Sequence, residues 1–285
     1  MKKLPHSDAP EDKAETATEP ILCLPKLLPR EEWVAAAEMA RRINPQNLPE
    51  RRMLIPRFDE TPERIAVLTT RYWSKNTEVL TVGFMDNPLA ELRKKILSHM
   101  NAWNKSINLR FRFSVSEPQV RIARIPNRGH WSYVGTDVLR IPKELPTMNL
   151  DSFTIETHDS EFRRVVRHET GHTLGCWHEH LRKELVELID PEKAIVYYQR
   201  TQGWNRAEVL KQVLTPIEES SLIGTKHTEQ DSIMCYHIPG SITRNGEPIV
   251  GGQDITKSDY AFMGSIYPKS NDRLKNSQRK SDTKK

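Results

Sequence analysis

One stretch decides the fold of this chain: His168-Glu169-Thr170-Gly171-His172-Thr173-Leu174-Gly175-Cys176-Trp177-His178-Glu179. Its first two histidines are four residues apart, so on a helix they project from one face and can direct two ring nitrogens at a single ion. Glu169 lies beside them as a candidate general base. The stretch therefore predicts a helix that carries two metal ligands and an acid–base carboxylate.

Gly175 is placed to end that helix, because glycine adopts the left-handed conformation without steric cost. The chain can then turn so that His178 returns as a third ligand. Three protein ligands leave the fourth position open, as catalytic zinc requires and structural zinc does not. The alternative is an amphipathic helix whose histidines are solvated or hydrogen-bonded.

The helix is also expected to begin well before its histidines. Asp159 or Ser160 can cap its start, and Phe162, Val165 and Val166 form an apolar stripe that continues into the ligand face. A buried, packed helix holds ligands more rigidly than a loop does.

A second segment, Asp231-Ser232-Ile233-Met234-Cys235-Tyr236, resembles the methionine turn of the metzincins. The pattern Ser-x-Met-x-Tyr, with Glu179 and Arg182 after the third histidine, narrows the resemblance to the astacin family of zinc metallopeptidases, closest in pattern to bacterial members. It covers roughly residues 74–268. Without the histidine motif, Met234 would be read as core filler and Tyr236 as a surface aromatic.

The resemblance implies a role for each matching side chain. Glu169 would be the catalytic general base, and Tyr236 would be a zinc ligand at rest that moves to hydrogen-bond the oxyanion. Met234 would be structural, and Glu179 would engage a new amino terminus if the chain is processed. One Zn²⁺ per chain would be held by His168, His172 and His178.

The resemblance also implies an α+β metzincin zinc-peptidase fold, with an upper twisted mixed sheet, two long helices and a smaller, more irregular lower subdomain. The expected organisation is an N-terminal extension and possible prosegment (1–73, one helix about 29–43), a catalytic domain (74–268, divided at 178/179) and a basic tail (269–285).

Apolar periodicity predicts the elements of the upper subdomain. Strands are expected at 80–85, 109–113 and 120–125. A helix should begin after Asn87-Pro88 and place these residues in the core: Leu89, Leu92, Ile96, Met100 and Trp103. By resemblance, 147–150 is the candidate edge strand to which an extended peptide substrate adds.

The chain has three cysteines, too few for the two disulfides typical of animal astacins. Cys176 and Cys235 are expected to be neighbours and could pair, act in redox chemistry or remain buried free thiols, which we favour. Cys23 could occupy the open zinc position and keep the enzyme latent, although flanking leucines favour burial of a small hydrophobe.

Composition argues against other classes. The net charge of +5 lies in residues 269–285, where seven Lys/Arg face two Asp, so nucleic acid is not expected as a partner. No apolar run is long enough for a membrane span. Charged residues follow Met1-Lys2-Lys3 where a signal peptide needs an apolar core. A cytoplasmic protein, one secreted by a non-classical route or one whose signal is removed all fit, and a bacterial source agrees with the few cysteines.

We therefore expect a monomeric zinc-dependent endopeptidase that binds protein or peptide substrates as an extended strand. A catalytically silent zinc-binding module for protein interaction is the alternative, disfavoured because Glu169 and Tyr236 are both present. A metal hydrolase acting on a non-peptide bond is disfavoured by the paired motifs. His180, His227 and His237 fall outside the ligand spacing and are expected to be surface or hydrogen-bonded residues.

Overall fold

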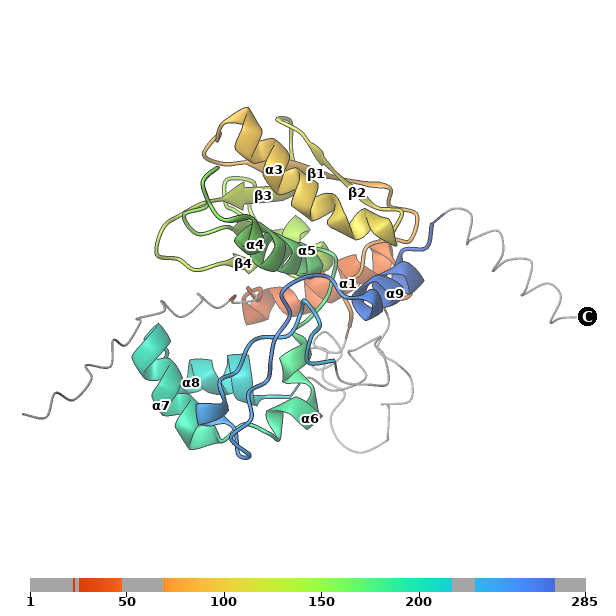
Figure 1. Cartoon of the computed structure of the whole chain (residues 1–285). Coiled ribbons are helices and arrows are strands. Elements are labelled where there is room, and N and C mark those ends of the chain that lie inside the picture. Colours follow the sequence, from red (N-terminus) through yellow and green to blue (C-terminus); the bar gives the residue numbers. More distant parts are fainter. Residues whose placement is uncertain (1–22, 24–25, 48–68, 217–228, 270–285) are drawn as a thin grey trace, which may run out of the picture.

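The computed structural model describes residue 23 and residues 26–47, 69–216 and 229–269. Its upper part contains a β-sheet with helices α3 (Ala90–Met100), α4 (Asp159–Glu161) and α5 (Arg167–Thr173) (Figure 1). Its smaller lower part contains α6 (Lys183–Val186), α7 (Pro191–Gln202) and α8 (Arg206–Val209). Helices α1 (Trp33–Ile43) and α9 (Lys257–Ile266) lie between them in this view. The expected α+β architecture, with a mixed sheet above an irregular lower subdomain, is confirmed.

The sheet has five strands in the order β2-β1-β3-β5-β4. The first four are parallel, and β4 runs antiparallel to β5. Apolar side chains of β1 explain its central place, because Leu80 and Val82 are fully buried. The strand bounds are β1 Val79–Phe84, β2 Arg110–Phe113, β3 Val120–Ala123, β4 Trp131–Ser132 and β5 Met148–Asn149.

The edge strand differs from the one expected. Residues 147–150 form β5 and its flanks, which lie inside the sheet between β3 and β4. The outer strand is β4. It precedes β5 in the chain, but it pairs with the far side of β5 in antiparallel fashion. Residues 23 and 26 in turn pair with β4 in parallel, opposite His130 and Tyr133.

Two helical segments cover one side of the sheet (Figure 1). Helix α3 (Ala90–Met100) continues into the 3-10 helix η3 (Asn101–Lys105). The other segment comprises α4 (Asp159–Glu161), a π-helical turn η5 (Phe162–Val166) and α5 (Arg167–Thr173).

Two details of these helices were predicted wrongly. Leu89 is not core: it precedes α3 as its N-cap and is 76% exposed. The N-cap of α4 is His158, whose Nδ1 accepts the Ser160 N–H, so Asp159 and Ser160 lie in the first turn. The apolar stripe is confirmed, because Phe162, Val165 and Val166 are all buried.

The lower part is built from short helices around a separate apolar core that includes Tyr198, Trp204 and Tyr236. Their bounds are η6 Glu179–Leu181, α6 Lys183–Val186, α7 Pro191–Gln202, α8 Arg206–Val209, η7 Leu210–Leu214 and η9 Gly240–Ile242. Helix α9 (Lys257–Ile266) packs against the upper core instead, through Met263 and the buried Tyr267 that follows it. None of the helices in the described ranges is long and apolar enough to cross a bilayer.

The expected helix near the N-terminus is present as η1 (Arg30–Glu32) and α1 (Trp33–Ile43), with Pro29 before it and Asn44 as its C-cap. It is tied to the upper part by side-chain amides. Asn47 Nδ2 donates to the Tyr72 carbonyl at 2.7 Å, and Asn44 Nδ2 donates to the Trp73 carbonyl at 3.0 Å. Residues 1–22 and the basic tail 270–285 lie outside the described residues.

Gly135 lies against the backbone of Arg71, and there is no room for a side chain at this position. Its φ is +50°, and an added Cβ would lie 1.8 Å from the Arg71 carbonyl oxygen. Gly203 also has a positive φ, +68°, but nothing lies within 4 Å of a Cβ added there.

We expect Gly203→Ala to cost about 1 kcal/mol of conformational strain. Gly135→Ala should cost more than about 3 kcal/mol, because the backbone must also move. Urea unfolding of both variants measures this; equal losses would show that residues 69–72 are not docked there.

Candidate active site

Helix α5 presents two buried imidazoles from one face. His168 and His172 are 6% and 0% exposed. The Nδ1 of His168 lies 2.6 Å from the Ile233 carbonyl oxygen, and the Nδ1 of His172 lies 2.8 Å from the Cys176 carbonyl oxygen. Since a carbonyl only accepts, both Nδ1 atoms are assigned the proton, and both Nε2 atoms are left with a lone pair.

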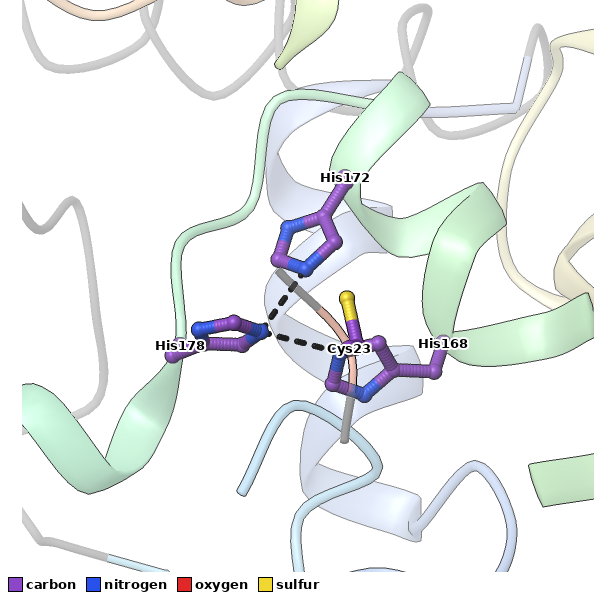
Figure 2. A group of neighbouring side chains, drawn as sticks. All are labelled: Cys23, His168, His172 and His178. Carbon is purple, nitrogen blue, oxygen red and sulfur yellow. Dashed lines mark hydrogen bonds between the residues drawn. The ribbon is translucent and has the colours of Figure 1, made fainter. Parts of the chain in front are cut away.

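The chain after α5 reverses at Gly175, which has φ +106° as a glycine turn requires. A side chain there would also strike Tyr72, because an added Cβ lies 2.7 Å from its Cδ1. The reversal brings His178 back over the helix. Its Nε2 lies 3.1 Å from His168 Nε2 and 2.9 Å from His172 Nε2, and Figure 2 shows the three rings facing one another.

These three nitrogens fit a zinc ion. Tetrahedral coordination with Zn–N distances of about 2.0–2.1 Å places ligand nitrogens about 3.3 Å apart, close to the spacing here. Two lone pairs directed at the same buried point repel unless a proton or a cation lies between them. The Cys23 thiol joins the group, and the four ligand atoms all lie within 4.8 Å of one another (Figure 2).

Glu169 is fully buried beside this group. Among the described residues, neither of its carboxylate oxygens has a well-formed hydrogen bond. The Cys23 thiol is nevertheless close enough to lower the pKa of the Glu169 carboxyl. Burial raises the pKa of the carboxyl to about 8, and the Cys23 thiol and Arg164 oppose the rise. A divalent cation close by would also lower this pKa.

Met234 packs beneath α5. A Cβ on Gly171 would lie 2.4 Å from the Met234 sulfur, so only glycine allows the helix to approach this turn. Asp259 of α9 holds the turn: its carboxylate accepts the Ser232 hydroxyl at 2.7 Å and the Ile233 N–H at 3.0 Å. The sequence analysis gave no role to Gly171 or Asp259, because the partners of both residues lie far away in the chain.

Tyr236 enters the site from the lower core and is 6% exposed. Its ring centroid lies 4.2 Å from that of His178 and 5.9 Å from that of His168. Burial raises the pKa of its phenol well above the usual value, and the neighbouring Cys23 and Glu169 add to the rise. The α7 and α8 helices therefore support Tyr236, whereas Met234 belongs to the upper core.

The other residues that the sequence analysis singled out lie away from the point where the three histidines meet, or outside the described residues. Glu179 forms an ion pair with Arg182, and burial raises the pKa of its carboxyl to about 7. Cys176 and Cys235 are buried free thiols, as we favoured, and lie in different cores. His237 is exposed and bonds the Val250 carbonyl, whereas His227 lies outside the described residues.

A cleft lies beside His168 and is also lined by His130, which precedes the outer strand β4. Side chains that sequence reasoning missed line it, notably His130 and Arg164, together with Cys23, Glu169 and Tyr236. Arg164 forms an ion pair with Glu161 at 2.7 Å on the helix that carries the ligands. His130 lies just before β4, and neither residue has a motif that could have identified it.

Comparison with known proteins agrees with this geometry. The profile of the Astacin peptidase family matches residues 67–250. One solved structure of myroilysin is 30% identical, with a TM-score of 0.66 over 70% of this chain and 97% of that one. A second has 30% identity and a TM-score of 0.55 over 70% and 86%. Zinc metalloproteinase nas-27 of Caenorhabditis elegans is 30% identical over 98 residues, which span 34% of this chain and 21% of that protein.

The fold and the histidine group are those of the metzincin class of zinc metallopeptidases. The chain belongs to the astacin family of peptidases. The match spans about one fifth of the length of its curated relative.

His130 should make the stability of the protein pH-dependent. Its Nδ1 accepts the Asp151 N–H at 3.0 Å, and burial, followed by Arg164, lowers its pKa from 6.5 to about 4. The unfolded chain then binds more protons between these values, so the free energy of unfolding should rise by up to about 3 kcal/mol from pH 4 to pH 6.5.

His130→Asn keeps an acceptor but does not titrate. Other buried histidines contribute in both proteins, so urea unfolding across this pH range should give the variant a shallower slope than the parent. Equal slopes would mean that His130 titrates normally.

Proposed function

We propose that this protein is a zinc-dependent endopeptidase that hydrolyses internal peptide bonds of protein substrates. His168, His172 and His178 would hold the ion, and its chemistry would be to polarise the substrate carbonyl and lower the pKa of water. The observation that carries the proposal is the meeting of three buried Nε2 atoms beside a buried carboxylate.

In this proposal Glu169 moves the protons. Its carboxylate accepts a proton from the attacking water and delivers it to the nitrogen of the leaving amine. Burial alone raises the pKa of this carboxyl, and a cation held by the three histidines would lower it again, so that Glu169 would be ionised and able to accept the proton.

Tyr236 would supply the donor for the developing oxyanion. Its phenol remains protonated at neutral pH, because burial raises its pKa, so its O–H can donate to an oxygen that gains charge in the transition state. A bond that forms mainly in the transition state raises turnover more than it strengthens substrate binding.

The substrate would lie along the outer side of β4, which offers backbone groups to an extended peptide. Binding through backbone suits an enzyme that cleaves within chains. In the described form, residues 23 and 26 occupy this edge, and the Lys26 N–H donates to the Ser132 carbonyl at 3.0 Å. The N-terminal segment and the substrate would therefore exclude each other.

We further propose that residues 1–73 act as a prosegment and that Cys23 closes the site. Its sulfur lies in the group of ligand atoms, and a thiolate is a strong zinc ligand. The parallel pairing with β4 holds the sulfur at that point. Activation would then require residues 23 and 26 to leave the edge.

A catalytically silent zinc-binding module remains the second candidate. The two candidates differ in whether they cleave protein. If the protein is an endopeptidase, casein incubated with it should yield internal fragments, detected by mass spectrometry, and a chelator that removes zinc should prevent this. Intact casein after displacement or removal of the N-terminal segment would favour the silent module.

Glu169→Gln tests the base. Turnover of an internally quenched peptide should fall by about 10²- to 10⁴-fold, because a carboxamide cannot accept the proton. Elemental analysis should find one zinc per chain in both proteins, since Glu169 is not a proposed ligand. An active Glu169→Gln variant would place the base elsewhere, and loss of zinc would give Glu169 a structural role.

Cys23→Ser tests latency. The full-length variant should hydrolyse the quenched peptide at least about tenfold faster than the parent, since a neutral hydroxyl is a far poorer zinc ligand than a thiolate. With Co²⁺ in place of zinc, the parent should show a thiolate-to-cobalt absorption band that the variant lacks.

Cys176→Ala is the matched control for the band. It removes a buried thiol whose sulfur contacts Met263 and lies outside the ligand group. The band should persist in this variant. A parent without the band, or an unchanged rate in Cys23→Ser, would rule out coordination by Cys23.

A further inference from the structure

His180 is a fully buried histidine that the proposed mechanism does not use. It follows the third ligand, His178, by two residues and lies in η6, but it does not belong to the group of possible metal ligands. The sequence predicted a surface or hydrogen-bonded residue. The structure confirms a hydrogen-bonded residue and packs its ring against those of His178 and Tyr236.

The face of the His180 ring covers the Tyr236 ring. Their centroids lie 4.3 Å apart with an angle of 21° between the planes. His178 approaches Tyr236 at a similar distance but is tilted by 46°, and His168 is more distant, at 5.9 Å. His180 is therefore the ring outside the ligand group that supports the phenol face to face.

A hydrogen bond sets the orientation of this supporting ring. The Nε2 of His180 lies 3.1 Å from the Gln212 carbonyl oxygen, in the short helix η7. Carbonyls in the last turn of a helix lack partners within the helix, so an imidazole N–H is a fitting donor for one of them. The lower core thus fixes the His180 ring through a backbone atom.

We infer that His180 is a positioning residue that holds the Tyr236 phenol in the orientation from which it reaches the oxyanion. The inference rests on the proposed function. An oxyanion donor is effective only when it is held close to where the charge develops, and an error of about 1 Å can cost about 10²-fold in rate. The flat, buried His180 ring allows the phenol ring to move only parallel to its face. It forms no hydrogen bond to the phenol that would have to break when the phenol moves.

Three variants separate the stacking of His180 on Tyr236 from its bond to Gln212; the His180 ring also lies 5.0 Å from the His178 ring, and the Tyr236→Phe background below separates that contact. His180→Phe keeps the flat ring and loses the bond to Gln212, His180→Gln keeps a donor and loses the ring, and His180→Ala loses both. With the quenched peptide, kcat should fall about tenfold or more in His180→Ala while KM changes little. His180→Phe should recover most of that loss, because the stacking face is restored.

The same substitutions in a Tyr236→Phe background test whether the effect passes through the phenol. There His180→Ala should change kcat by less than about twofold, since the group that it positions is already absent. His99→Ala is the control: His99 is another buried histidine, tilted against Phe162 at 5.4 Å and remote from Tyr236. It should lower the unfolding midpoint without changing kcat.

A binding measurement provides a readout that does not depend on turnover. A phosphinic peptide mimics the tetrahedral transition state, so its Kd, measured by calorimetry, should rise about tenfold in His180→Ala, whereas the Kd of a product peptide should not change. Equal loss for both ligands, or an undiminished loss in the Tyr236→Phe background, would overturn the positioning role. If the Cys23→Ser protein, in which the proposed latency is released, cleaves no peptide at all, the proposed function itself has failed, which is a different outcome.

Discussion

Three buried imidazoles meet at one point, and contacts from several distant segments of the chain hold them there. Two of them carry their protons on Nδ1, held by the Ile233 and Cys176 carbonyls, so their lone pairs are directed at one buried point. Such an arrangement is unfavourable unless a cation compensates the lone pairs. One of the orienting carbonyls lies at the end of the ligand helix and the other in the distant methionine turn. The geometry of the site therefore depends on both segments being folded together.

Residues 234–236 connect the two halves of the molecule at this point. Met234 belongs to the upper core, and Tyr236, two residues later, belongs to the lower core. The sulfur lies under α5, against the glycine that allows close approach, and the phenol lies over the imidazoles. This turn thus places a rigid support on one side of the histidines and a proton donor on the other. This explains why the Asp259 carboxylate binds the backbone and hydroxyl groups of the turn.

The N-terminal segment uses the same two features that a substrate would use. It pairs with β4, the outer strand among the described residues, and it brings a sulfur to the point where the histidines meet. Helix α1 is held to the upper part by Asn44 and Asn47, some twenty residues further along the chain. The fold therefore has a firmly docked helix beside a short covering segment. Removing only the covering segment would leave those amide contacts in place.

The sequence by itself determined the features that depend on local spacing. The ligand helix, the turn at Gly175, the strands and the helix after Pro29 follow from periodicity and from backbone preferences, which act over a few residues. Tertiary structure decided what depends on distant partners. The placement of residues 147–150 inside the sheet, the exposure of Leu89 and the stacking of His180 on Tyr236 could not be read locally. Strand order and ring contacts arise from packing between segments far apart in the chain, and a single sequence records residue spacing but not which surfaces meet.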